Sequence, residues 1–412
     1  MSFKKKLSYN IVIQAIGPIL SFFTIFMIAK FAGVEVQGRF ASITAWINLI
    51  VVIGTFGFPQ SFIYLVNKKK ISPKILFNFS KYYILLFILL FILIVFTLFK
   101  YGLINNIIIS NPYQIFILSI PVVILIFHGL LRGIYLTFNQ SILFATFSIL
   151  PATFLFLLVL IGILLNYYNF QLIYLICSLP VLIVALSLIN PFLKSVKRYA
   201  IKQFPWSALF NHGTHSFLQA LFFALQPIIA YWFINKYIGS VLEIGYFNLG
   251  LFLVQGLLVP ISMVAPLLFD YWTKNDDQMF ILRFTKTKIF ILELLIGGII
   301  AFVLNYFIPV VFGSEYESSI EIAQILIFII PVVIHTRVLM PFIHSKGYPI
   351  LNTYSGLIRF IVFLILSYLW MINISQELVG LAVCWSIAEL IGALLTINFF
   401  IHINKKEKTY AR

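Results

Sequence analysis

Long apolar stretches, separated by short polar segments, recur along the whole 412-residue chain. Twelve of them approach the length of about 20 residues that a helix needs to cross a bilayer. They lie near residues 8–30, 41–66, 82–100, 114–137, 142–165, 171–193, 210–235, 246–269, 289–308, 322–343, 353–372 and 380–402. Short segments of alternating polarity, the signature of a membrane barrel, do not occur. The pattern predicts an all-α polytopic membrane protein with twelve transmembrane helices.

Composition supports this interpretation. The chain is 62% hydrophobic and only 10% charged, whereas a soluble globular protein is about 25% charged. The first stretch follows Lys4, Lys5 and Lys6, but it is too long for the apolar region of a signal peptide, so we expect a retained helix. Cys177 and Cys384 fall inside predicted spans and are expected to pack as small apolar side chains, without a disulfide framework or metal site.

The net charge of +16 would suggest nucleic acid in a soluble protein. Here 22 of the 28 Lys and Arg residues fall at the two termini and in the even-numbered loops. Cytoplasmic loops of membrane proteins carry such an excess of basic residues. We therefore expect both termini in the cytoplasm and no nucleic-acid partner.

The sequence contains an internal repeat. QIFILSIPVVI (114–124) and QILIFIIPVVI (324–334) agree at eight of eleven positions, at an offset of 210. IAKFAG (28–33) and INKYIG (234–239) are related at an offset of 206. Two further pairs lie 207 residues apart: Pro59 with Pro266, and Cys177 with Cys384. Four pairs near one offset indicate two homologous halves.

Each predicted half has six helices, so both enter the membrane in the same orientation as parallel repeats. We assign residues 1–193 and 210–412 to the halves and 194–209 to a linker. Parallel repeats of this kind generally place a substrate between them. The linker, KSVKRYAIKQFPWSAL, is either an amphipathic helix on the inner membrane surface that couples the halves or an ordinary cytoplasmic loop.

Polar residues inside the spans are candidates for a binding site, because lipid penalises them. His128 and Arg132 share one face of the fourth predicted helix. The repeat makes His335 the counterpart of His128, whereas Arg337 lies roughly 200° round the helix from His335. Arg132, Arg337 and Arg359 all lie one to two turns inside the cytoplasmic end of a span.

These arginines either snorkel to the inner interface or form a cationic patch in an inward-facing cavity. We predict the cavity, because guanidinium groups bind phosphate bidentately and stay charged. The candidate substrate-binding residues are Arg132, Arg337, Arg359, His128, His335, Arg39, Lys30 and Lys236.

Two acids are candidates for ion coupling. Glu389, in the last span, is expected within about a turn of Arg359, either as a structural ion pair or as a titratable or sodium-coupled site. Glu293, near the start of the ninth span, is expected to reach the interface near Lys286 or Lys288. No Walker loop, nucleophile elbow or Cys/His cluster occurs, so we expect neither an enzyme nor a cofactor.

Four segments resemble a known family. FAGVEVQGRFASITAW (31–46) and KYIGSVLEIGYFNLG (236–250) open the two halves alike, with Gly, a short spacer and Gly-x-aromatic. VFGSEYESS (311–319) resembles a Phe-Gly-x-Glu-Tyr outer loop, and HSKGYPILNTY (344–354) resembles a small-Gly-x-Pro turn. With the two six-helix halves, these segments are similar to polysaccharide transporters of the multidrug/oligosaccharidyl-lipid/polysaccharide (MOP) superfamily, specifically the Wzx-type O-antigen flippases. One departure is that ALQPIIAYWF (224–233) carries Gln226 where the family often has an Asp.

The resemblance implies a MATE-like fold in the bacterial inner membrane. It also implies a flippase for an oligosaccharide carried on undecaprenyl diphosphate, as in lipopolysaccharide O-antigen biosynthesis, with a polysaccharide polymerase and a chain-length regulator as plausible partners. Two alternatives remain open. One is a cation-coupled multidrug exporter of the same superfamily, and the other is a membrane polysaccharide polymerase, which the short outer loops disfavour.

Overall fold

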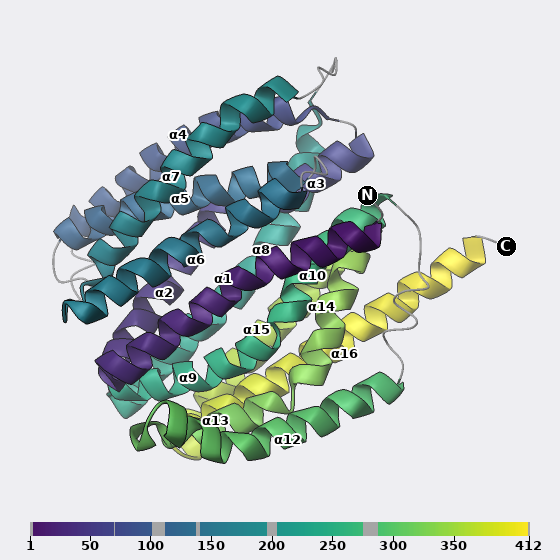
Figure 1. Cartoon of the computed structure of the whole chain (residues 1–412). Coiled ribbons are helices and arrows are strands. Elements are labelled where there is room, and N and C mark those ends of the chain that lie inside the picture. The colour runs from purple at the N-terminus through teal and green to yellow at the C-terminus, as the bar shows by residue number, and fades with distance from the viewer. Residues whose placement is uncertain are drawn as a thin grey trace. The chain divides into compact units, whose positions relative to one another are not determined.

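The computed structural model describes residues 3–69, 71–100, 112–136, 141–195, 204–274 and 287–410, and these residues are almost entirely helical (Figure 1). The α-helices are α1 (Phe3–Ala32), α2 (Val34–Thr55), α3 (Phe58–Lys69), α4 (Pro73–Lys100), α5 (Pro112–Leu136), α6 (Ser141–Leu164), α7 (Phe170–Ser195), α8 (Trp206–Phe233), α9 (Val241–Leu257), α10 (Val259–Lys274), α12 (Thr287–Val311), α13 (Ser318–Ile327), α14 (Ile330–Ser345), α15 (Pro349–Asn373) and α16 (Leu378–Tyr410). A π-helical turn, η1 (Ile234–Ile238), follows α8, and a 3-10 turn, η2 (Ser314–Tyr316), precedes α13.

The predicted membrane segments coincide with these helices. Each of the twelve falls on one helix or on two consecutive helices. Ten helical stretches within the described residues are long and apolar enough to cross a membrane, and an eleventh is obtained if α13 and α14 count as one bent span. The eighth predicted segment is divided between α9, which has 17 residues, and α10. The chain is therefore a multi-pass, all-helical membrane protein.

Three predicted spans are broken, and each break precedes a proline at the second residue of the following helix. The prolines are Pro59 in α3, Pro260 in α10 and Pro331 in α14. Proline lacks the N–H that would continue the preceding helix, and its ring clashes with the carbonyl four residues earlier. The α13–α14 pair bends by 51° at its break.

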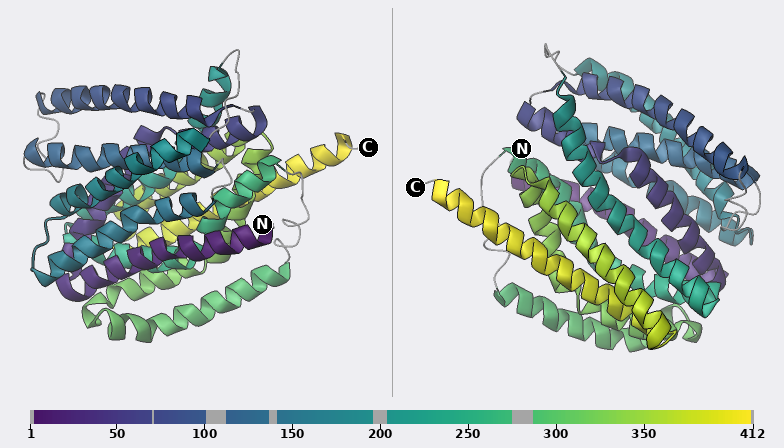
Figure 2. Two further views of the ribbon diagram at one scale, coloured as in Figure 1. Left: turned by 45° about the horizontal axis from the view of Figure 1, so that its top comes forward. Right: turned by 180° about the vertical axis from the view of Figure 1, so that it is seen from behind.

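The helices pack into two compact units. Unit 1 contains Met1–Ile11, Ile25–Ala45 and Leu218–Arg412, and unit 2 contains Val12–Thr24 and Trp46–Phe217. In unit 2, α5 packs against α3, α4, α6 and α7; in unit 1, α14 packs against α10, α12, α15 and α16. Figure 2 shows α15 running beside α16 in unit 1. α5, which carries the repeated segment 114–124, and α14, which carries the end of its counterpart 324–334, are thus central to their units. This position explains how they hold polar side chains away from lipid.

The unit boundaries do not follow the predicted halves, because residues 25–45 of the first half pack within unit 1. Residues 196–203 of the predicted linker lie outside the described residues. The division into 1–193 and 210–412 therefore stays a prediction from the sequence repeat.

One crossing within unit 1 displays the repeat directly. Val34 and Gly38 of α2 pack against Val241 and Gly245 of α9, and the members of each pair lie 207 residues apart. A Cβ atom on Gly38 would lie 2.3 Å from the Val241 carbonyl oxygen, and one on Gly245 would lie 2.4 Å from the Val34 carbonyl oxygen. Each glycine therefore lets the other helix's backbone approach, which gives a physical role to the second Gly of the Gly-x-aromatic motif.

Candidate functional site

A buried ion pair joins α15 to α16. Arg359 Nη1 donates a hydrogen bond to Glu389 Oε2 at 3.3 Å, and the two side chains are only 3% and 11% exposed. The guanidinium carbon of Arg359 lies 3.2 Å from the ring centroid of Phe223 in α8. The expected pairing of Glu389 with Arg359 is therefore present, and Arg359 is buried within unit 1.

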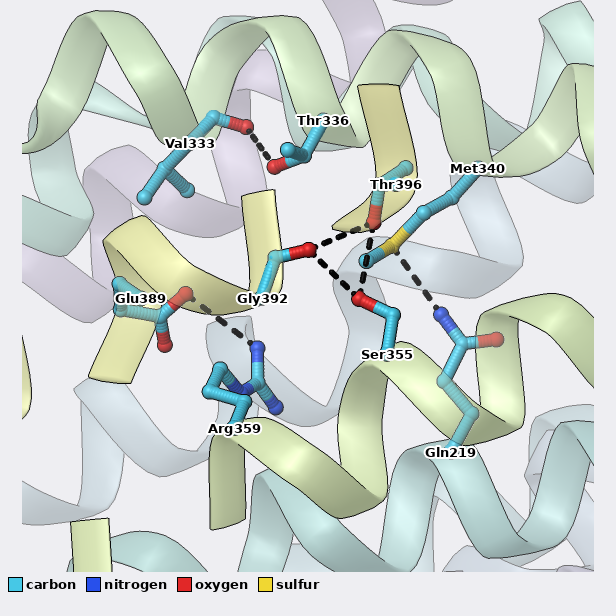
Figure 3. A network of polar contacts seen from close by, with 9 residues as sticks. All are labelled: Gln219, Val333, Thr336, Met340, Ser355, Arg359, Glu389, Gly392 and Thr396. Atoms are coloured by element: carbon cyan, nitrogen blue, oxygen red, sulfur yellow. Dashed lines mark hydrogen bonds and ion pairs between the residues drawn. The ribbon is translucent and has the colours of Figure 1, made fainter. Parts of the chain in front are cut away.

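Small polar residues hold the two helices close around this pair (Figure 3). Ser355, one turn before Arg359, donates to the Gly392 carbonyl at 2.7 Å and hydrogen bonds to the Thr396 hydroxyl at 2.8 Å. A Cβ atom on Gly392 would lie 3.1 Å from Arg359 Cβ. These contacts fix the position of the arginine between α15 and α16.

Arg359 retains hydrogen-bonding capacity beyond its ion pair. Among the described residues, neither its Nε nor its Nη2 atom has a hydrogen-bond partner, although both atoms are buried. Buried guanidinium donors normally find acceptors, because leaving them unmet is costly. The arrangement can therefore accept a further anionic or carbonyl oxygen at Arg359.

Arg337 belongs to the same electrostatic cluster. It lies on α14, donates from Nη1 to the Ser262 hydroxyl of α10, and interacts electrostatically with both Glu389 and Arg359. Two guanidinium groups and one carboxylate give this cluster a net positive charge. The neighbouring part of α14 is held by Gln219 of α8 and Asn352 of α15, which donate to the Met340 sulfur at 3.2 Å and the Met340 carbonyl at 2.8 Å.

Arg132 lies on α5 in unit 2, half-buried, and interacts electrostatically with His128. The inference that it joins Arg337 and Arg359 in one cavity stays a prediction. The imidazole of His128 is buried in unit 2. Its Nε2 atom donates to the Phe147 carbonyl at 2.7 Å and its ring packs on that of Phe147 at 4.3 Å.

His335 has a partner that sequence reasoning missed. Its Nδ1 atom donates to the Pro331 carbonyl at 2.8 Å and lies 3.4 Å from Glu293 Oε2. Glu293 was expected near Lys286 or Lys288, whose side chains lie outside the described residues, so that expectation stays a prediction. The structure turns Glu293 towards His335. The pattern of polar residues within single spans could not reveal this pair, because Glu293 and His335 lie on different helices.

The three remaining candidates lie at the ends of helices. Lys30 is exposed in the last turn of α1. Arg39 is exposed on α2 and forms an ion pair with Glu35, one turn away. Lys236, in η1, lies 4.7 Å from the ring centroid of Trp232 and 5.3 Å from that of Tyr237. The structure does not bring these cations to Arg359, and their role in binding stays a prediction.

The sequence was compared with models of protein families. The model described as "Polysaccharide biosynthesis protein" matches residues 3–272, about two thirds of the chain. The chain belongs to this family. Arg337, Arg359 and Glu389 lie beyond the residues matched, so the family model does not bear on them. No curated protein matches the sequence.

Solved structures share the fold of this polysaccharide biosynthesis protein. The lipid II flippase MurJ in an inward closed conformation has a TM-score of 0.69 at 16% identity, over 97% of this chain and 89% of MurJ. An outward-facing multidrug resistance MATE transporter of the MOP superfamily has a TM-score of 0.73 at 12% identity, covering 99% and 98% of the two chains. A MOP superfamily transporter from Pyrococcus furiosus has a TM-score of 0.71 at 13% identity, covering 98% and 96%. At these identities, the comparisons establish a MurJ- and MATE-like fold.

Proposed function

We propose that this protein is a flippase for an oligosaccharide linked to undecaprenyl diphosphate. It moves the repeat unit of an O-antigen or similar surface polysaccharide from the inner to the outer leaflet of the bacterial inner membrane by alternating access. In this proposal the chain spans the membrane twelve times as two parallel six-helix halves, with both termini in the cytoplasm. A polymerase and a chain-length regulator act on the translocated unit.

The observation that carries the proposal is the unmet hydrogen-bonding capacity of Arg359. Two of its nitrogen atoms lack partners among the described residues, and Arg337 adds a second positive charge nearby. A diphosphate offers several anionic oxygens that match such donors. The family description and the fold shared with a lipid II flippase support a lipid-linked substrate.

A multidrug exporter is the second candidate, because the fold is equally shared with multidrug resistance MATE transporters. A cationic drug needs an available carboxylate in the binding region. Near Arg359 the acid is Glu389, and it is already engaged by the arginine. The net positive charge of the cluster therefore favours an anionic substrate.

Deletion of the gene in its host tests the function. We expect lipid-linked repeat units to accumulate on the inner leaflet. Unpolymerised units on the outer face would support a polymerase, and drug sensitivity alone would support an exporter. Either of those two results would overturn the proposal.

Purified protein in vesicles tests the site. Arg359→Gln and Arg337→Gln are each expected to slow translocation of a fluorescent undecaprenyl-diphosphate sugar at least tenfold, whereas Lys81→Gln, which neutralises an exposed cation on α4, leaves the rate unchanged. A tenfold loss corresponds to about 1.4 kcal/mol. The loss of one hydrogen bond to a charged group, about 1.5–3 kcal/mol, is enough to cause it. Full activity in both arginine variants would remove the anion site from the mechanism.

A further inference from the structure

A second ionisable pair lies in unit 1, apart from Arg359. Glu293 of α12 and His335 of α14 approach to 3.4 Å between Oε2 and Nδ1, and their side chains are 18% and 9% exposed. The ring of Phe290 meets the imidazole edge-on, with centroids 5.7 Å apart. The proposed binding of diphosphate at Arg359 involves neither Glu293 nor His335, so the pair needs its own explanation.

The position of Glu293 on α12 is unusual for a carboxylate. Most of the surrounding helix presents exposed apolar side chains, including Leu292 at 56% and Leu295 at 62% exposure. Glu293 instead begins the stripe that packs inward, four residues before the buried Gly297 and eight before the buried Ala301. The carboxylate therefore lies on the inward-packing side of α12 and points towards α14.

Hydrogen bonding limits the protonation states that this pair can adopt. The Pro331 carbonyl can only accept, so the 2.8 Å contact requires a proton on His335 Nδ1. Glu293 Oε2 is buried and has no hydrogen-bond partner among the described residues. Its charge is therefore compensated by imidazolium, or it carries a proton itself. Both arrangements contain the same number of protons and leave the pair neutral.

We propose that Glu293 and His335 form a binding site for one transferable proton, and that this proton couples a proton gradient to transport. The inference rests on the proposed transport function for its coupling step, but not for the proton site itself. When the pair releases its proton to water, a neutral imidazole faces an ionised carboxylate. The pair then carries one negative charge.

The geometry favours a proton over a metal cation. Sodium-like hard cations are surrounded by about six oxygen ligands, whereas this site offers one carboxylate and an imidazole nitrogen that already donates to a carbonyl. Groups of three or more His, Cys, Asp or Glu that could hold a metal are absent from the described part of the chain.

The charged surroundings isolate the pair. His335 is the one charged partner that Glu293 meets among the described residues. Arg337 projects from another side of α14 towards Arg359 and Glu389. Among the described residues, no cation then lies against the new negative charge; the side chains of Lys286 and Lys288 lie outside them.

Such a charge must be hydrated or re-paired, because a buried, uncompensated carboxylate is strongly unfavourable. Water entry or separation of α12 from α14 would meet that need. Since α14 also carries Arg337, the proton state of the pair is linked through one rigid helix to the proposed anion site.

The repeat supplies an internal control. His128 is the sequence counterpart of His335 and is equally buried: the exposed fractions of the whole residues are 8% and 7%. Its imidazole packs on Phe147, and the described structure records no acid against it. His128→Asn thus matches His335→Asn in chemistry and burial but leaves the proposed proton site intact. Glu321→Gln, which removes an exposed carboxylate on α13, is the control for Glu293→Gln.

Direct titration of purified protein in lipid vesicles tests the proton site without any substrate. Infrared absorption reports the carboxyl group and nitrogen-15 NMR reports the imidazole. We expect one proton to leave the pair between about pH 5 and 8, the range in which histidine side chains change charge. Glu293→Gln should shift the His335 midpoint by at least one pH unit, and His335→Asn should shift the Glu293 midpoint likewise. His128→Asn and Glu321→Gln should change neither.

A pair that keeps the same protonation across that range would overturn the inference and leave a permanent structural ion pair. Thermal unfolding of each variant identifies misfolded protein, and His335→Gln provides a second substitution if His335→Asn does not fold. Titration that occurs in wild type but is unaffected by either partner's substitution would equally contradict the proposal.

Transport in vesicles with an imposed pH gradient tests coupling. We expect the wild-type rate to rise at least fivefold with the gradient and the Glu293→Gln rate to be independent of it. The rate of the Glu321→Gln control should depend on the gradient as in wild type. Gradient-independent transport by wild type overturns the coupling. If wild type titrates but translocates no lipid-linked sugar, the proposed function fails while the proton site stands.

Discussion

Arg359 combines two roles that a single substitution would confuse. It neutralises Glu389 within the packed interior of unit 1, and it offers two further nitrogen atoms to a ligand. Removing one partner of a buried ion pair costs about 3–5 kcal/mol, because the other charge is left uncompensated. A loss of transport in Arg359→Gln alone could therefore reflect either lost anion binding or lost stability.

The double variant Arg359→Gln/Glu389→Gln separates the two. We expect Arg359→Gln to lower the thermal unfolding temperature of the detergent-solubilised protein. The double variant should restore most of it, because two neutral side chains then replace the buried Arg359–Glu389 pair. Binding of undecaprenyl diphosphate should stay lost in both. If the double variant recovers binding together with stability, Arg359 is only a structural counter-ion of Glu389.

Arg359→Lys tests the geometry of the donor rather than its charge. Lysine keeps the positive charge but lacks the planar fork that stacks on an aromatic ring and donates bidentately. We expect Glu389 to remain neutralised and stability to fall by less than in Arg359→Gln, while the affinity for undecaprenyl diphosphate drops about tenfold, or about 1.4 kcal/mol. Unchanged affinity would mean that charge alone holds the ligand.

At the scale of helices, the sequence predicted positions well and interruptions poorly. Each of the twelve predicted apolar segments falls on helix, because the length of apolar sequence that a membrane helix needs can be read from neighbouring residues alone. The breaks depend on tertiary packing. Pro121 lies inside the continuous α5, whereas Pro331, in the matching position of the repeat, begins α14 after a bend. The pairing of Glu293 with His335 also escaped prediction, because it depends on how two helices are rotated.

The α2–α9 crossing gives a prediction at this scale. Gly38→Ala or Gly245→Ala places a methyl group 2.3 or 2.4 Å from a backbone carbonyl oxygen of the other helix, so the helices must separate. We expect each variant to lose about 1–3 kcal/mol, the usual cost of overpacking, measured as a lower unfolding temperature in detergent. Gly256→Ala in α9 is the control, because nothing lies within 4 Å of its added Cβ. It should be neutral or gain up to about 1 kcal/mol from better helix propensity. Equal effects in all three variants would contradict the close approach.

At the scale of the whole chain, unit 1 contains residues from both predicted halves. Tyr316, in the loop after α12, is fully buried. Its hydroxyl donates to Gln37 Oε1 at 2.6 Å, and the Ala29 carbonyl oxygen also lies within 3.3 Å of it. Burial raises the pKa of this phenol, and the nearby Glu315 and Tyr246 raise it further, so the hydroxyl remains a donor at neutral pH. Together with the α2–α9 crossing, these bonds tie residues 25–45 to the second half.

Alternating access by two rocking halves requires this tie to break during each transport cycle, so weakening it should favour the state in which it is open. Tyr316→Phe removes a buried donor and leaves the Gln37 carbonyl oxygen unpaired, a loss of about 1–3 kcal/mol. An equilibrium shifts about tenfold for each 1.4 kcal/mol. The reporter is a cysteine in place of Ser42, which is buried one turn beyond Gly38. It should react about tenfold faster with a membrane-impermeant maleimide added from outside. Tyr306→Phe, which alters an exposed tyrosine on α12, serves as control with the same reporter, and Cys177 and Cys384 are replaced by Ala in every variant. Labelling that is unchanged by Tyr316→Phe, or that accelerates only from the cytoplasmic side, would show that this contact does not close the outer end of the protein.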